Sequence, residues 1–182
     1  MKNNSIKTVV AVGIGAALFF VLGRFVAIPS PVPNTNISLQ YAVLALLAAM
    51  YGPVAGGLIG FIGHALIDLS WGGSPWWSWV ITSAFVGVVI GLFAKKLNVQ
   101  EGVFDKTKTA IFAIANVAAY VIGWVVVAPV LDILIYAEPV KKVFAQGVFA
   151  AISNTITGVI VGGLLIVAYT KTIAKKGSLD QE

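Results

Sequence analysis

Long apolar blocks alternate along the whole chain with short breaks that are polar or contain proline and glycine. A hydrocarbon core about 30 Å thick needs roughly 20 helical residues per crossing, so blocks of this length predict transmembrane helices. We expect six, at about residues 5–28, 38–52, 54–69, 76–95, 109–133 and 141–170. No linker is long or polar enough to separate two domains, so residues 1–182 are expected to form a single all-α transmembrane domain, a compact six-helix bundle.

The second and third blocks would read as one overlong helix without the dipeptide Gly52-Pro53 between them. Proline interrupts the helical hydrogen-bond ladder, and a glycine before it favours a tight turn. The pattern therefore predicts two antiparallel helices that meet at this dipeptide.

Composition places the chain in a membrane. Hydrophobic residues make up 59% of it and charged residues only 10%, whereas soluble domains are about 25% charged. There is no cysteine, which excludes disulfides and thiolate metal sites.

The basic residues predict the topology, because short cytoplasmic loops of membrane proteins are enriched in lysine and arginine. With both termini in the cytoplasm, three basic residues fall outside: Arg24, Lys141 and Lys142. Nine fall inside: Lys2, Lys7, Lys95, Lys96, Lys106, Lys108, Lys171, Lys175 and Lys176. The net charge of +5 is thus explained by orientation and by contact with the lipid bilayer, and no run resembles a nucleic-acid-binding arm. We expect a multi-pass protein of the cell membrane.

Four of the five tryptophans lie in the segment "DLSWGGSPWWSW" (68–79), which this topology places at the outer interface. Tryptophan anchors helices at membrane interfaces, and anchoring alone would explain one or two rings. Four indoles within nine residues favour a binding surface as well. Trp71, Trp76 and Trp77 are our candidates for contact with a ligand.

A second outer segment, "IPSPVPNTNISLQY" (28–41), holds three prolines in five residues and is expected to be stiff and extended. Its neutral polar groups and its aromatic ring are candidate ligand contacts: Asn34, Asn36, Gln40 and Tyr41. The alternative is that Asn34 or Asn36 caps the second helix.

His64 and Asp68 lie four residues apart and therefore on one face of the third helix. An ionisable residue inside a membrane span is a candidate functional residue. No third ligand with suitable spacing accompanies the pair, so we expect no metal site. Tyr136, at the outer end of the fifth helix, is a further candidate contact, whereas Asn116 and Asn154 are expected to form hydrogen bonds between helices.

Catalytic motifs are missing: the sequence has no phosphate-binding lysine loop, no nucleophile elbow and no HExxH, and it has one histidine in all. We expect no catalytic residue, no enzymatic activity and no permanently bound cofactor. An outward cavity lined by aromatic rings and neutral polar groups suits a flat, polar, weakly charged molecule.

The six spans, the length, a small-residue stripe in the first helix and the aromatic outer face together resemble the S components of energy-coupling factor (ECF) vitamin transporters. The stretches "PVPNTNISLQYAVLALLAAMYGPVAGGLIGFIGHAL" and "GSPWWSWVI" are similar to a subfamily long catalogued as uncharacterised, to which a cobalamin-transporting member is assigned. The resemblance implies a high-affinity vitamin-binding subunit.

In that family the S component docks on a transmembrane coupling subunit (EcfT) carried by two ATPase subunits (EcfA and EcfA'), and it topples in the membrane to release the vitamin inside. Docking uses an Ala-xxx-Ala pattern in the first helix. This chain offers Ala11-xxx-Gly15 and Gly13-xxx-Ala17, so these four residues are the implied docking residues.

Cobalamin is the substrate we favour, because indoles can pack on a corrin while amide groups meet its amide side chains. A different vitamin (riboflavin, biotin, a thiamine precursor or pyridoxine) is an alternative. So is an autonomous ion-coupled secondary carrier in which Asp68 or Asp132 carries a proton, and so is a structural membrane protein without a small ligand.

Overall fold

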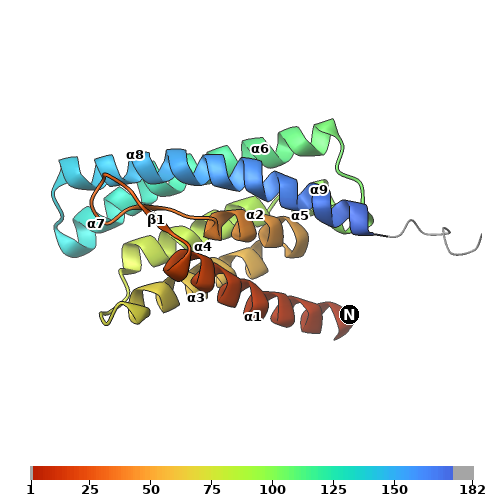
Figure 1. The fold of residues 1–182 in the computed structure, drawn as a ribbon, viewed down its shortest axis with the longest axis horizontal. Helices are drawn as coiled ribbons and strands as arrows, with labels where there is room; N and C mark the ends of the chain where they lie inside the picture. The colour runs from red at the N-terminus through yellow and green to blue at the C-terminus, as the bar shows by residue number, and fades with distance from the viewer. Residues whose placement is uncertain (1, 174–182) are drawn as a thin grey trace, which may run out of the picture.

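The computed structural model describes residues 2–173, and it is a bundle of helices with one short β hairpin (Figure 1). In chain order the elements are α1 (Lys2–Phe25), β1 (Ile28–Pro29), β2 (Asn36–Ile37), α2 (Gln40–Tyr51), α3 (Pro53–Ser70), α4 (Trp77–Gly91), α5 (Ala94–Leu97), η1 (Val99–Glu101), α6 (Lys106–Val121), η2 (Ile122–Val127), α7 (Ala128–Tyr136), α8 (Val140–Ile156), η3 (Thr157–Val161) and α9 (Gly162–Thr172).

The two longest helices each contain a π-helical insert. Helices α6 and α7 run continuously through η2 over Lys106–Tyr136, and α8 and α9 run through η3 over Val140–Thr172. A π-helical turn shifts the register of the helix by one residue and is often found at functional sites. The predicted fifth and sixth spans are thus each one helix with a local irregularity.

The six apolar blocks all form helices, but they differ in their capacity to cross a membrane. Within the described residues, four helices are long and apolar enough: Ile6–Phe25, Pro53–Ser70, Lys106–Tyr136 and Val140–Thr172. A fifth span results if Trp77–Gly91 and Ala94–Glu101, bent by 40° between them, are counted together. Helix α2 has 12 residues and is short for a crossing. The count of six crossings and the cytoplasmic position of the termini stay predictions.

The break at Gly52-Pro53 is confirmed. Helix α2 ends at Tyr51 and α3 begins at Pro53, where the missing N–H of proline costs nothing. Gly52 between them has φ +89°, a conformation that favours glycine.

Helices α3 and α4 pack with their backbones in contact. A Cβ atom on Gly56 would lie 2.3 Å from the carbonyl oxygen of Gly87, and one on Gly87 would lie 2.1 Å from that of Gly56. One turn further along α3, a Cβ on Gly60 would lie 2.3 Å from the carbonyl oxygen of Ser83. Small residues permit such approach where the surrounding lipid supplies no hydrophobic driving force. These glycines of α3 and α4 therefore serve packing within the bundle.

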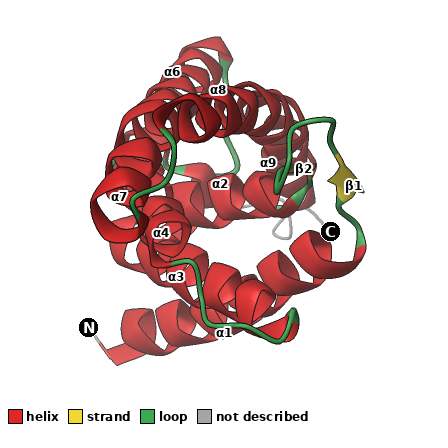
Figure 2. Cartoon of the chain, turned by 90° about the vertical axis from the view of Figure 1, so that its left-hand side faces the viewer, coloured by secondary structure: helices red, strands yellow, loops and turns green. Residues whose placement is uncertain are grey.

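The connections between β1 and β2, between α3 and α4 and between α7 and α8 gather at one end of the molecule, the left in Figure 1, whereas α1 begins and α9 ends toward the other. Figure 2 looks onto the loop end and shows these connections around the ends of the helices. A group of buried aromatic rings lies just inside the loop end. The ring of Tyr41 makes edge-to-face contacts with Phe19, Tyr120 and Trp124, with centroids 5.3 to 5.9 Å apart.

Candidate functional site

Two adjoining cavities open at the loop end of the bundle. The larger has a volume of about 380 Å³ and the smaller about 230 Å³, and Asn34, His64, Asp68 and Trp79 line both. The larger is lined by Gly23, Ala27, Asn34, Thr35, Asn36, Ser38, Gln40, Tyr41, His64, Ile67, Asp68, Trp71, Trp79, Trp124, Ala150 and Asn154. The smaller adds Trp76, Asp132, Glu138, Lys142 and Gln146. The larger volume falls in the range typical of small-molecule sites, roughly 300–1,000 Å³, and the smaller lies below it.

The proline-rich segment forms a hairpin over the larger cavity, rather than one extended stretch. Strands β1 and β2 pair antiparallel, with Ile28 opposite Ile37. At its tip the Thr35 hydroxyl donates to the Val32 carbonyl at 2.6 Å, and the Val32 N–H donates to the Ser30 hydroxyl at 3.0 Å. The hairpin is thus held by its own hydroxyl groups.

This hairpin, residues 28–37, touches helices on both sides of the cavity. The Gln146 side chain on α8 donates to the Pro33 carbonyl at 2.8 Å. On the other side, the hydroxyl of Ser38, the residue directly after the hairpin, donates to the Leu22 carbonyl of α1 at 3.3 Å. We call residues 28–37 the hairpin lid, because it covers the cavity from α1 to α8.

The capping role considered for Asn34 and Asn36 is wrong. Helix α2 begins after Leu39, which makes no side-chain cap, and the Gln40 N–H donates to the Ser38 hydroxyl at 3.2 Å. Asn34 instead has φ +59° at the hairpin tip and Asn36 lies in β2. Both asparagines line the cavity.

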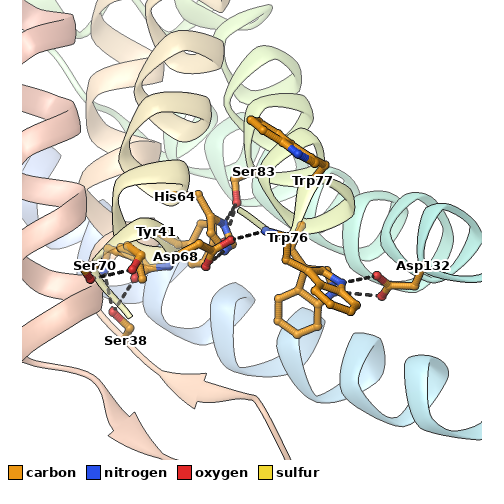
Figure 3. A network of polar contacts seen from close by, with 12 residues as sticks. Ser38, Tyr41, His64, Asp68, Ser70, Trp76, Trp77, Ser83 and Asp132 are labelled. Atoms are coloured by element: carbon orange, nitrogen blue, oxygen red, sulfur yellow. Dashed lines mark hydrogen bonds and ion pairs between the residues drawn. The ribbon is translucent and has the colours of Figure 1, made fainter. Parts of the chain in front are cut away.

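Three of the four tryptophans in the tryptophan-rich segment (68–79) line a cavity, and the fourth does not. Trp71 and Trp79 line the larger cavity and Trp76 lines the smaller one. Trp77 stacks on Phe61 at 6.1 Å and lines neither, and Figure 3 shows it directed away from the polar network. Trp77 is therefore the one indole of the segment left for interfacial anchoring, and the other three belong to the cavity walls.

Asp132 holds this segment in place. Its carboxylate is 2% exposed and accepts hydrogen bonds from Trp76 Nε1 at 2.7 Å, from Trp79 Nε1 at 2.9 Å and from the hydroxyl of Ser78. Tyr136, one turn further along α7, stacks on Trp76 with centroids 4.0 Å apart and accepts a hydrogen bond from the Trp77 N–H. Helix α7 thereby fixes the start of α4 (Figure 3).

His64 and Asp68 form part of a second polar network, also drawn in Figure 3. His64 Nε2 lies 3.8 Å from Asp68 Oδ1, while His64 Nδ1 lies 2.6 Å from the Ser83 hydroxyl, which also contacts the Tyr41 hydroxyl at 2.8 Å. Asp68 Oδ2 accepts the Trp76 N–H at 2.8 Å. The prediction that His64 and Asp68 share one face of α3 is confirmed. Contacts within the protein occupy most of the polar atoms of both side chains.

The structure thus brings eight of the ten candidate contacts to the cavities: Asn34, Asn36, Gln40, Tyr41, His64, Asp68, Trp71 and Trp76. Trp77 and Tyr136 line neither cavity. The structure therefore offers no support for ligand contact by these two side chains, and contact by the other eight stays a prediction.

Several cavity residues escaped the sequence analysis. Trp79 lay in the tryptophan-rich segment but was not singled out. Asp132 was considered only as a proton carrier, although a carboxylate within an apolar stretch is a candidate functional residue. Trp124 sits in "VIGWVVVAP" without any polar neighbour to mark it. Asn154 was assigned to contacts between helices, yet it lines the cavity, and within the described residues its side chain makes no hydrogen bond.

Asn116 also departs from its expected role. Its Nδ2 donates to the Phe112 carbonyl within α6, at 2.8 Å, and its Oδ1 accepts no hydrogen bond from the described residues. The expected bond between helices is therefore wrong for both asparagines.

The four small residues of α1 do not share one face. Ala11 and Gly15 are buried in the bundle, and a Cβ on Gly15 would lie 2.7 Å from both Ile59 and Leu47 side chains. Gly13 and Ala17 are exposed, and a Cβ on Gly13 would meet nothing within 4 Å. Only the pair Gly13-xxx-Ala17 is open to another subunit, and docking there stays a prediction.

Comparison with known proteins identifies the family. The model of the family described as "ECF-type riboflavin transporter, S component" matches residues 3–171. UPF0397 proteins from an Exiguobacterium and from Streptococcus agalactiae are each 53% identical over 182 residues, and one from Clostridium perfringens is 52% identical over 184, with 100% of both chains covered each time.

The fold agrees with this assignment. The crystal structure of the S component for biotin from an ECF-type ABC transporter matches with a TM-score of 0.69 and 18% identity, covering 97% of each chain. At this identity the match shows the fold. Together with the family model and the relatives, it establishes that this membrane protein belongs to the S components of ECF-type transporters.

Proposed function

We propose that the chain is the high-affinity substrate-binding subunit of a vitamin uptake system and that it takes its vitamin from outside the cell. One observation carries the proposal: the cavity lies between the hairpin lid and the tryptophan-rich segment, at the end opposite to the start of α1 and the end of α9. Its walls combine indoles with amide and hydroxyl groups, which suits a ring-containing polar molecule.

Transport would depend on partner subunits. The family implies docking on a transmembrane coupling subunit whose two ATPases hydrolyse ATP, and toppling of the S component to release the vitamin inside. The exposed pair Gly13 and Ala17 on α1 supports docking through this helix, because small residues allow close helix contact in lipid.

Cobalamin is the first candidate substrate. The side chains of Asn34, Asn36 and Gln40 can meet the amide groups of a corrin, and Trp71, 65% exposed at the rim, offers an indole face to a molecule that extends beyond the cavity. A corrin would enter with one edge only, since about 380 Å³ encloses part of it.

A smaller ring vitamin such as biotin or riboflavin is the second candidate, and the cavity volume is the observation that favours it. A molecule of that size would be enclosed almost completely, as ligands in such sites usually are. The hairpin lid would then cover the vitamin, with Gln146 holding the lid through Pro33.

The test is calorimetric titration of the purified protein in lipid nanodiscs with cobalamin, riboflavin, biotin, thiamine and pyridoxine. We expect submicromolar binding of one vitamin. Trp71→Ala should weaken it by about 1 to 3 kcal/mol, by analogy with aromatic stacking on nucleobases. Trp77→Ala is the matched control, since Trp77 lines neither cavity. Absence of binding in the whole panel, on folded protein, would reject the proposal.

A second experiment separates a subunit from an autonomous carrier. In proteoliposomes that contain this chain alone, we expect no vitamin accumulation under a proton or sodium gradient. Gradient-driven uptake that Asp68→Asn abolishes would show a secondary carrier instead. Addition of the coupling subunit, the two ATPases and ATP should produce uptake.

A further inference from the structure

Trp124 has a buried polar group that the bundle leaves unused. Its side chain is 1% exposed, and its indole N–H donates no hydrogen bond to any described residue. A buried donor without an acceptor destabilises the folded protein, so native proteins rarely keep one without a reason. The ring lines the larger cavity.

The aromatic neighbours of Trp124 hold its ring in place and leave its N–H without an acceptor. Tyr41 and Trp79 pack edge-to-face against the indole, with centroids 5.7 and 5.2 Å away. The hydroxyl of Tyr41 is engaged with Ser83, and the N–H of Trp79 is donated to Asp132. Trp124 also lies in η2, one of the two π-helical segments among the described residues. The donor is therefore fixed in place with its aromatic neighbours already bonded elsewhere.

Asn154 supplies a second unused group in the same cavity. It lies on α8 and is 4% exposed, and its side-chain amide makes no hydrogen bond within the described part of the chain. An amide side chain offers both a carbonyl acceptor and an N–H donor. Asn154 lies three residues before η3, the other π-helical segment among the described residues.

We propose that Trp124 and Asn154 form a subsite for an amide-type group of the vitamin, a carbonyl with an adjacent N–H as in an amide, a ureide or an imide. The Trp124 N–H donates to that carbonyl and the Asn154 side-chain oxygen accepts the adjacent N–H. The inference rests on the proposed function and narrows the substrate class: cobalamin, biotin and riboflavin carry such a group, whereas thiamine and pyridoxine do not.

Asn116 shows that an unpaired polar atom alone does not make this subsite. Its Oδ1 is buried without a partner as well, but Asn116 lines neither cavity. Asn116 differs from Trp124 and Asn154 because it lines neither cavity, and it therefore supplies a matched control.

The first arm of the experiment is the vitamin panel on the wild-type protein. Binding of cobalamin, biotin or riboflavin, and of neither thiamine nor pyridoxine, is the expected result. If only thiamine or pyridoxine binds, the proposed function stands and the amide subsite is wrong. If no vitamin binds, the proposed function fails and the subsite fails with it.

The second arm uses variants and the vitamin that binds. Trp124→Phe removes the N–H and should weaken affinity about tenfold, and Asn154→Leu, which leaves a polar group of the vitamin unpaired, about 10- to 100-fold. Trp77→Phe and Asn116→Leu are the matched controls and should leave affinity unchanged. Unaltered affinity in both Trp124→Phe and Asn154→Leu would overturn the subsite.

A third variant separates the hydrogen bond from packing, since phenylalanine is also smaller than tryptophan. Incorporation of 3-benzothienylalanine at position 124 keeps the shape of the ring and replaces N–H by sulfur. Affinity should fall about tenfold here as well, while the thermal unfolding of the ligand-free protein stays unchanged. Wild-type affinity in this variant would assign the effect of Trp124→Phe to packing and overturn the donor role.

Discussion

At the residue scale, Asp132 organises the loop end of the molecule. Three donors from α4 and the residue before it converge on one buried carboxylate, from Trp76, Ser78 and Trp79. Such a convergence fixes the rotamers of two cavity-lining indoles at once. The carboxylate thus acts on the site through the tryptophans it holds.

Asp132→Asn should destabilise the protein by about 1–3 kcal/mol, because an amide N–H would face an indole N–H and leave buried donors without an acceptor. Thermal unfolding in detergent measures this change. Glu138→Gln is the control: Glu138 pairs with Lys142 at 2.7 Å near the surface, where such a pair contributes about 1 kcal/mol or less. Equal stability of Asp132→Asn and wild type would contradict the anchoring role.

At the element scale, two contacts join elements next to the site: the glycine crossing of α3 with α4, and the contact of α1 with the tryptophan-rich segment. In the second, the Arg24 guanidinium lies 3.7 Å from the centroid of a Trp71 ring, a cation–π geometry. Arg24 lies in the last turn of α1, and Trp71 follows α3 and lines the cavity.

Arg24→Gln should speed dissociation of the bound vitamin about two- to fivefold, since an exposed cation–π contact contributes about 0.5–1 kcal/mol. Stopped-flow measurement of the dissociation rate checks this, with Lys141→Gln as a control that removes another basic residue of the predicted outer face. A rate unchanged by Arg24→Gln would show that the contact does not restrain Trp71.

Gly87→Ala should destabilise the bundle by about 1–3 kcal/mol, because the added methyl group has to push α4 away from the Gly56 carbonyl. Gly13→Ala is the matched control, with the same chemical change in open space on α1. Unfolding temperatures of the two variants in detergent should therefore differ. If they coincide, the crossing is looser than the contact distances indicate.

At the scale of the whole molecule, α1 presents two faces with separate tasks. Its inner face, which includes Ala11, Gly15 and Phe19, packs on the bundle, and its outer face carries Gly13 and Ala17. A change on one face should therefore affect folding, and a change on the other should affect assembly with a partner.

Gly13→Leu and Ala17→Leu should each leave vitamin binding intact and abolish uptake by the complete transporter, because a bulky side chain prevents close helix contact. Calorimetry on the isolated chain and uptake in proteoliposomes with the coupling module measure the two properties. Gly15→Leu is the contrast: its side chain would collide with Ile59 and Leu47, so it should lower stability first. Normal uptake in the two outer variants would remove this face as the docking surface.

The sequence by itself determined the helices and the end at which the candidate site lies. Apolar blocks of membrane length, the break at Gly52-Pro53 and the tryptophan-rich segment are local patterns, and local patterns suffice for helix positions and turns. The spacing of His64 and Asp68 likewise predicted their shared face, because residues four apart in a helix always lie close together.

Only the tertiary structure decided which of these residues meet. Trp77 points away while Trp79 lines the cavity, Gly15 packs inward while Gly13 does not, and Trp124 and Asn154 reach one cavity from two helices. In a chain that is apolar nearly everywhere, hydrophobicity does not distinguish a side facing lipid from a side facing another helix. The orientation of each helix about its axis therefore depends on backbone contacts such as Gly56 on Gly87, which no single segment of the sequence contains.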